Sequence, residues 1–159
     1  ICAFGSTRHV GVSCTEDKNL QSLIDAKTEY VVIFGKSWTF QVTEILKTTL
    51  EENLAMIRDT CKFLCDNGRQ VIYDAEHFFT GYQENSEYAI KTLEAAVEGG
   101  AKVLSLCETK GGCMLKDCET AVELIKQYFP EVTIETYELS HAFITQGGPA
   151  CVAIQYIKK

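Results

Sequence analysis

Short apolar runs alternate with stretches of helical periodicity along most of the chain. The run at residues 1–4 precedes a stretch with apolar residues at helical spacing, residues 13–27. The run "YVVIFG" at residues 30–35 is continuous, as in a strand that is buried on both faces. Residues 49–66 then carry one apolar stripe at helical spacing, so the first part of the chain predicts two strand–helix units.

Two further units follow. The run "QVIYDA" at residues 70–75 precedes a predicted helix over about residues 86–98, and "KVLSLC" at residues 102–107 precedes one over about residues 117–129. Four consecutive strand–helix units predict parallel strands that are joined by right-handed crossovers.

Capping residues predict where two of these helices begin. Ser13 with Glu16, and Thr49 with Glu52, have the spacing of capping boxes, in which each side chain bonds to the other residue's backbone amide. The Asn-Gly pair at residues 67–68 predicts the end of the second helix.

The C-terminal part has a different pattern. Residues 132–139 alternate apolar and polar, and a Gly-Gly-Pro turn leads to a final apolar run at residues 151–157. A connection without a crossover helix favours antiparallel pairing. We therefore predict a single α/β domain over residues 1–159. Its sheet is mixed but mainly parallel, with four βα units and two C-terminal strands at or near one edge. The predicted architecture is an open, flavodoxin-like layer sandwich rather than a closed barrel.

Composition and charge narrow the possible partners. The 159 residues are 46% hydrophobic and carry a net charge of −7 with scattered basic residues, which argues against a nucleic-acid partner. No apolar stretch approaches the roughly 20 residues of a membrane helix. The eight cysteines lie mostly in apolar segments, where thiols pack as small hydrophobic groups, so we predict a reducing, cytoplasmic compartment.

Polar residues follow each of the four predicted parallel strands, at residues 5–8, 35–38, 74–77 and 108–112. In open α/β sheets, ligands bind at the carboxyl ends of the parallel strands, where these residues lie. Here Glu76 and the adjacent histidine could act as an acid–base pair or as metal ligands. The alternative is that exposed strand ends collect polar residues without any function.

The histidines and glycines match none of the common metal or cofactor motifs. The three histidines form no His-x-His or HExxH pair, and the glycines form neither a GxGxxG sequence nor a P-loop. We therefore predict no metal site and no cofactor.

Five phrases carry a resemblance to a known family: "AFGSTRHVGVS", "VVIFGKSWTFQVTE", "TTLEENLAMIRD", "VIYDAEHFFTGY" and "LSLCETKGG". Through them, residues 1 to about 112 resemble the middle of citramalate synthases, which are relatives of isopropylmalate synthase. The resemblance implies a (βα)8 barrel that condenses acetyl-CoA with a 2-oxo acid at a divalent metal. The matching stretch would supply the third to sixth strand–helix units of that barrel.

The chain also departs from that family. Its Arg-Asp-Gly motif and its His-x-His pair, which hold the metal, are both missing, and "CETKGG" replaces Asp-Thr-Asn-Gly-Gly. The catalytic candidates that the resemblance leaves are Glu76, His77, Arg8 and Thr109. If they converge, they form a vestigial cleft that could bind a small anion.

The tail, residues 117–159, resembles the C-terminal end of DegV-type fatty-acid-binding proteins. The resemblance implies ligand contacts from Gln146, which replaces the family's histidine, and from Thr145 and His141. From the two resemblances we predict a recombined or engineered scaffold, in which residues 117–159 complete the sheet and the parent synthase activity is lost. The alternatives are fatty-acid binding through the tail, residual metal-dependent acyl-CoA transferase chemistry, and a truncated enzyme with a coincidental tail. A homodimer could form through an exposed sheet edge.

Overall fold

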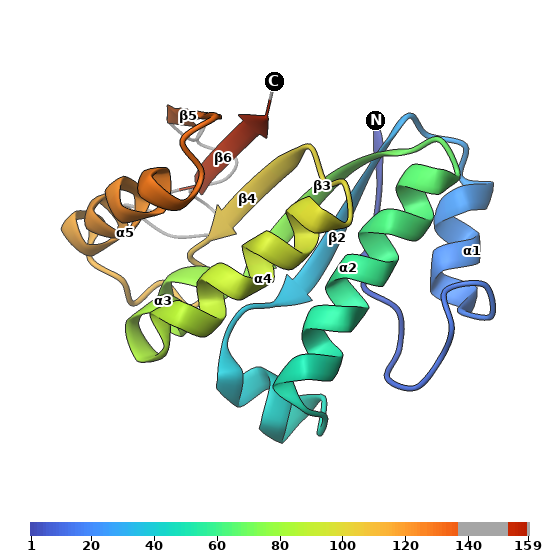
Figure 1. Cartoon of the computed structure of the whole chain (residues 1–159), viewed down its shortest axis with the longest axis horizontal. Coiled ribbons are helices and arrows are strands. Elements are labelled where there is room, and N and C mark those ends of the chain that lie inside the picture. The colour runs from blue at the N-terminus through green and yellow to red at the C-terminus, as the bar shows by residue number, and fades with distance from the viewer. Residues whose placement is uncertain (137–152, 159) are drawn as a thin grey trace.

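The structure is a computed structural model that describes residues 1–136 and 153–158. Figure 1 shows the elements in the order in which they follow one another. The strands are β1 (Cys2–Ser6), β2 (Tyr30–Lys36), β3 (Gln70–Glu76), β4 (Val103–Cys107), β5 (Val132–Thr136) and β6 (Ala153–Lys158). The helices are α1 (Lys18–Asp25), the π-helix η1 (Gln41–Ile45), α2 (Leu50–Asp66), α3 (Phe78–Glu84), α4 (Ser86–Glu98) and α5 (Leu115–Tyr128).

The strands form one mixed, open sheet with the order β1-β2-β3-β4-β6-β5. Strands β1 to β4 are parallel, whereas β6 pairs antiparallel with both β4 and β5. The predicted fold class is therefore confirmed, including the two C-terminal strands at one edge. The position of β6 between β4 and β5 was not predicted, because periodicity carries no information about strand order.

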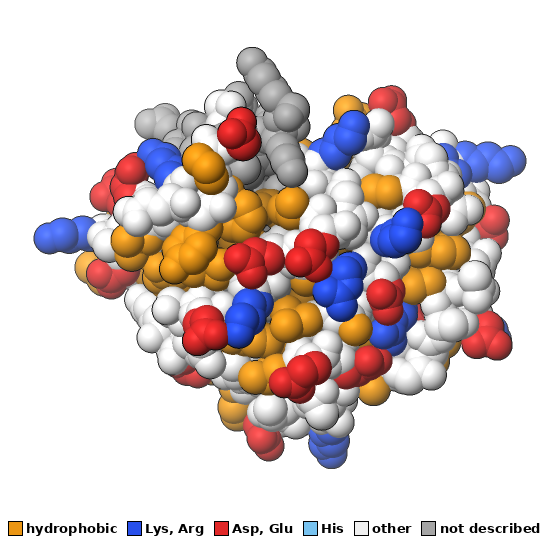
Figure 2. Space-filling view, in the orientation of Figure 1, with side chains coloured by type: hydrophobic (Ala, Val, Ile, Leu, Met, Phe, Trp, Pro, Cys, Tyr) orange, Lys and Arg blue, Asp and Glu red, His pale blue; other side chains and the backbone are white. Residues whose placement is uncertain are grey.

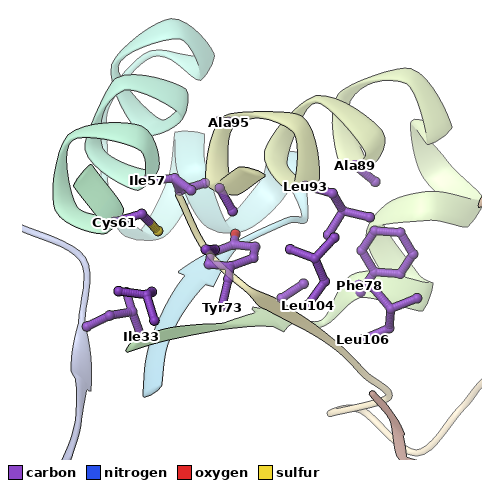
Figure 3. Close-up of a cluster of buried hydrophobic side chains, with 14 of the residues drawn as sticks. Ile33, Ile57, Cys61, Tyr73, Phe78, Ala89, Leu93, Ala95, Leu104 and Leu106 are labelled. Atoms are coloured by element: carbon purple, nitrogen blue, oxygen red, sulfur yellow. The ribbon is translucent and has the colours of Figure 1, made fainter. Parts of the chain in front are cut away.

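The helices of the described part pack on one face of the sheet, and α1, α2 and α4 lie side by side in Figure 1. Alternate strand residues point toward them and are buried: Val31, Ile33, Val71, Tyr73, Ala75, Leu104 and Leu106. Figure 3 shows Tyr73 and Leu104 directed at the helix residues Ile57 and Leu93. Flavodoxin-like folds carry helices on both faces, so this sheet is open but has a single helix layer.

The other alternate residues form the second face of the sheet, against which no described helix packs. Strand register places them in rows. Phe4, Val32, Ile72 and Val103 form an apolar row, and Ser6, Phe34, Asp74 and Ser105 form a mixed row one step nearer the carboxyl ends. Lys36 and Glu76 face each other at the end of β2 and β3. The second face thus changes from apolar to polar toward the carboxyl ends of the parallel strands.

Acidic and basic side chains are interspersed over the helix-covered face (Figure 2). Arg58 pairs with Glu98 at 3.0 Å, and Lys62 pairs with Asp66 at 3.0 Å. Exposed pairs of this kind contribute about 0–1 kcal/mol each, so the helix layer is stabilised mainly by its buried side. Among the described residues, no helix combines the length and the apolar character that crossing a membrane requires.

The start of α1 differs from the prediction. Asp17, rather than Ser13, is its N-cap, and the Asp17 carboxylate accepts hydrogen bonds from the backbone amides of Asn19 and Leu20. Ser13 instead donates to the Glu16 side chain at 2.7 Å, before the helix begins. The capping-box prediction for Ser13 and Glu16 is therefore wrong, because the buried carboxylate of Asp17, four residues after Ser13, caps the helix instead.

The second capping box is half confirmed. Thr49 caps α2 by accepting from the backbone amide of Glu52 at 3.1 Å. The Glu52 carboxylate, however, pairs with Arg8 at 2.8 Å. The positive charge of Arg8 attracts this carboxylate more strongly than a neutral backbone amide would.

Asp17 makes the stability of the loop before α1 depend on pH. Burial alone would raise the pKa of Asp17, but hydrogen bonds from the backbone and ring of His9 lower it overall. A carboxyl with a lowered pKa stabilises the fold above its unfolded pKa, about 3.9, and this contribution is lost as the pH falls. We expect urea denaturation to show a smaller loss of stability between pH 7 and pH 3 in Asp17→Asn than in the unsubstituted chain. Equal losses in the two proteins would contradict this assignment; Asp25→Asn, on the last turn of α1, is the control.

Candidate functional site

The carboxyl ends of β2, β3 and β4 bring charged, thiol and hydroxyl side chains to one region of the sheet. The strand residues reach it because they alternate onto the second face, and the loops after β3 and β4 add the rest. The residues concerned are Lys36, Asp74, Glu76, His77, Cys107 and Thr109, which we call the edge cluster.

Lys36 and Glu76 are opposite each other in the register of β2 and β3, and they form an ion pair. Their side chains are 17% and 27% exposed, so the pair is partly shielded from solvent. The Lys36 ammonium also lies 5.2 Å from the centre of the Phe34 ring. The Lys36–Glu76 pair therefore lies at the polar end of the second face.

Asp74 lies two residues before Glu76 on the same strand and the same face. The Cys107 thiol donates to an Asp74 carboxylate oxygen at 2.9 Å. Burial raises the pKa of Asp74, the Cys107 hydrogen bond opposes the rise, and the charge of Glu76 adds to it. Burial, together with the charge of Asp74, also raises the pKa of the Cys107 thiol.

His77 follows β3 and precedes α3 in a left-handed conformation, with φ of 54°, which is uncommon for a residue other than glycine. Its backbone amide donates to the Thr109 hydroxyl at 3.0 Å, and its ring centre lies 5.7 Å from that of Trp38. The ring atom Nδ1 is buried and makes no hydrogen bond within the described part of the chain.

Arg8 does not join these residues. Its guanidinium binds the α2 carboxylates of Glu52 at 2.8 Å and Asp59 at 3.1 Å, and its backbone amide donates to Thr60 at 2.9 Å. The structure therefore brings together three of the four catalytic candidates, Glu76, His77 and Thr109, and places Arg8 between the β1–α1 loop and α2.

Two residues of the loop after β4 depart from the Asp-Thr-Asn-Gly-Gly sequence, and the side chains of both have interaction partners. Glu108 accepts a hydrogen bond from the backbone amide of Gly112 at 2.9 Å. The Lys110 ammonium lies 5.5 Å from the centre of the Trp38 ring, whose Nε1 donates to Glu84 at 2.5 Å. These contacts connect the loop that carries Thr109 to the loop after β2.

A pocket of about 550 Å³ opens beside the edge cluster, between the β1–α1 loop and η1. Its volume is within the range of small-molecule sites, about 300–1,000 Å³. Ile45 of η1 contributes an exposed apolar wall, and Lys36 supplies a positive charge. A π-helical turn is rare and often occurs at functional sites.

The tail candidates Gln146, Thr145 and His141 lie outside the described residues. Within residues 1–136 and 153–158, no three His, Cys, Asp or Glu side chains are grouped so that they could hold a metal ion. These residues do not, by themselves, form the divalent metal site that the family resemblance implies.

Sequence reasoning missed the roles of Lys36 and Cys107. The spacing of Asp74 and Glu76, two residues apart on a predicted strand, signals that both face the same way. Their partners come from neighbouring strands, and only the register shows which residues these are.

Comparison with curated proteins gives clear similarities. The chain is 47% identical to an (R)-citramalate synthase of Aquifex aeolicus over 134 residues, which is 84% of this chain and 25% of the relative. It is 50% identical to one of Sulfolobus acidocaldarius over 114 residues, 72% of this chain and 22% of the relative. For one of Geobacter sulfurreducens the identity is 47% over 133 residues, 84% of this chain and 25% of the relative. The chain thus spans about a quarter of the length of these relatives, and no protein-family model matches it.

These similarities correct the functional prediction. Five curated citramalate synthases are 41–51% identical to the chain over 72–84% of its length, and this similarity contradicts the prediction of an engineered scaffold without the parent activity. A 134-residue match within 159 residues extends beyond residue 112, where the resemblance was expected to end, and includes α5. Nothing in these relatives supports fatty-acid binding.

Proposed function

We propose that the chain is a segment of the catalytic domain of a citramalate synthase-type enzyme and supplies one wall of its active site. The observation that carries the proposal is the match to (R)-citramalate synthases, 134 residues long in one case. A match of that length within this chain includes every residue of the edge cluster. The proposed wall is the edge cluster together with the pocket beside it.

The second face of the sheet supports this proposal. In a (βα)8 barrel, side chains from the strands fill the interior in layers, and the active site lies at the carboxyl ends of the strands. The second face has such layers, with an apolar row below and the Lys36–Glu76 pair at the carboxyl end. A single helix layer is also what a segment of a barrel has, because its helices lie only outside.

The edge cluster contains the types of side chain that the formation of citramalate requires. Citramalate carries two carboxylates and a hydroxyl group, so a site that forms it has to move protons and bind negative charge. Glu76 is a carboxylate able to accept a proton. Lys36, the Thr109 hydroxyl and the unpartnered His77 Nδ1 could bind oxygen atoms of the substrate or product.

An exchange of segments tests the proposal. The 133 residues of this chain that match the Geobacter sulfurreducens relative would replace the matching segment of that enzyme, and formation of (R)-citramalate would be measured. We expect the exchanged enzyme to be active and Glu76→Gln to reduce kcat by about 10²-fold or more, as for loss of a general base. Glu87→Gln, at an exposed pair with Lys91 on α4, is the matched control and should leave kcat unchanged. A folded exchanged enzyme that forms no product, or one that tolerates Glu76→Gln, would contradict the proposal.

A further inference from the structure

Two carboxyl groups lie on the second face of β3, and the chain gives them different partners. Glu76 has a full positive charge beside it, the Lys36 ammonium. Asp74 is flanked in the sheet by Phe34 and Ser105, and its hydrogen-bond partner is the Cys107 thiol at 2.9 Å. Neighbouring carboxyl groups in environments that favour opposite charge states can take the roles of acid and base.

We propose that Asp74 and Glu76 divide proton transfer at the edge cluster, with Asp74 holding a proton that it can donate and Glu76 accepting one. Cys107 is the positioning residue that orients Asp74 through its S–H···O bond. This inference rests on the proposed function for its substrate, but the charge states of the two carboxyl groups can be tested in the chain itself.

The charged and titratable groups around Asp74 favour this division. On β3 the neighbour is the Glu76 carboxylate, on β2 it is Lys36, which is already paired with Glu76, and on β4 it is the Cys107 thiol. The Asp74 carboxyl group is largely buried, and this burial raises its pKa. The hydrogen bond from the Cys107 thiol offsets part of the rise, and the negative charge of Glu76 adds to it. A weak S–H donor fixes the direction of the carboxyl group without making it a permanent anion.

The first test is a carbon-13 NMR titration of the Asp74 carboxyl group in the whole chain. We expect its midpoint above the ordinary value of about 3.9 for aspartate. Cys107→Ala removes the donor and should raise the midpoint further, by roughly half a unit to one unit, as expected for the loss of one hydrogen bond. Cys107→Ser keeps a donor and should prevent this additional rise. Cys2→Ala, at an exposed cysteine in β1, is the control and should leave the midpoint unchanged.

A midpoint at or below the ordinary value, or one that Cys107→Ala does not move, would overturn the inference. A second measurement does not depend on the Cys107 variants. Asp74→Asn removes the negative charge beside the thiol, so alkylation of Cys107 at pH 9 should become several-fold faster, with exposed Cys2 as the internal reference. An unchanged rate would show that the two groups are not coupled. If both tests succeed and the exchanged enzyme forms no citramalate, the inference holds for the chain and the proposed function fails.

Discussion

Phe78→Ala is expected to lower the free energy of unfolding by about 3–5 kcal/mol, the usual cost of removing a fully buried phenylalanine. Phe78 begins α3 with none of its surface exposed, and its ring packs against those of Phe79 and Tyr82 at 5.6 and 5.8 Å. Urea denaturation measures this loss. Because Trp38 is the only tryptophan and its ring contacts His77, its emission will also report whether the edge cluster has moved.

The control for this prediction is Phe40→Ala. Phe40 is 47% exposed beside Trp38, and its removal should change stability by less than about 1 kcal/mol. Comparable losses in the two variants would mean that α3 is not anchored by Phe78. They would also leave the position of His77, the residue before α3, without a structural explanation.

Gly81→Ala is expected to cost about 3 kcal/mol, at the upper end of the range for overpacking in a core. A Cβ atom at this position of α3 would lie 2.4 Å from the Ser37 carbonyl oxygen and 2.9 Å from the Trp38 Cα atom. Both are backbone atoms, so a side-chain rotation cannot relieve the contact. The loop after β2 would have to move away from α3, which chemical denaturation and Trp38 emission would both detect.

Gly112→Ala is the matched control, because a Cβ atom there would meet nothing within 4 Å. We expect it to change stability by no more than about 0.5 kcal/mol, as at other exposed positions. A large loss at Gly112, or none at Gly81, would contradict the close approach of α3 to the loop after β2.

Periodicity predicted the elements whose own residues determine their structure. The β2 run and the α2 stripe are strong local patterns, and the antiparallel final strand was predicted because no crossover helix was expected before it. Helix α3 was not predicted, because "FFTGYQE" has no helical stripe and contains a glycine. It forms because the core buries Phe78 and Phe79 and because Gly81 lets its backbone approach Ser37. Those are tertiary causes, which a local pattern does not show.

The sequence could predict an edge for the candidate site but not the pairings of its residues. Polar residues after the parallel strands favoured the carboxyl edge, and the structure places Glu76, His77 and Thr109 there. Arg8 follows β1 just as Glu76 ends β3, yet it binds α2 carboxylates that come about 50 positions later in the chain. Whether a charged side chain lies at the carboxyl edge of the sheet or binds to the helix layer depends on which opposite charges the fold places near it.

The antiparallel pair β6 and β5 limits where a further parallel strand can join the sheet. Strand β6 hydrogen-bonds along the whole of β4, the side on which a parallel neighbour would otherwise add. On the opposite side, β1 pairs only with β2 among the described residues, so β1 is the edge strand of the parallel part of the sheet. A strand that extends the parallel part of this sheet in register would therefore lie beside β1. The pocket between the β1–α1 loop and η1, which is lined by Ser6 at the end of β1, would lie close to the added strand.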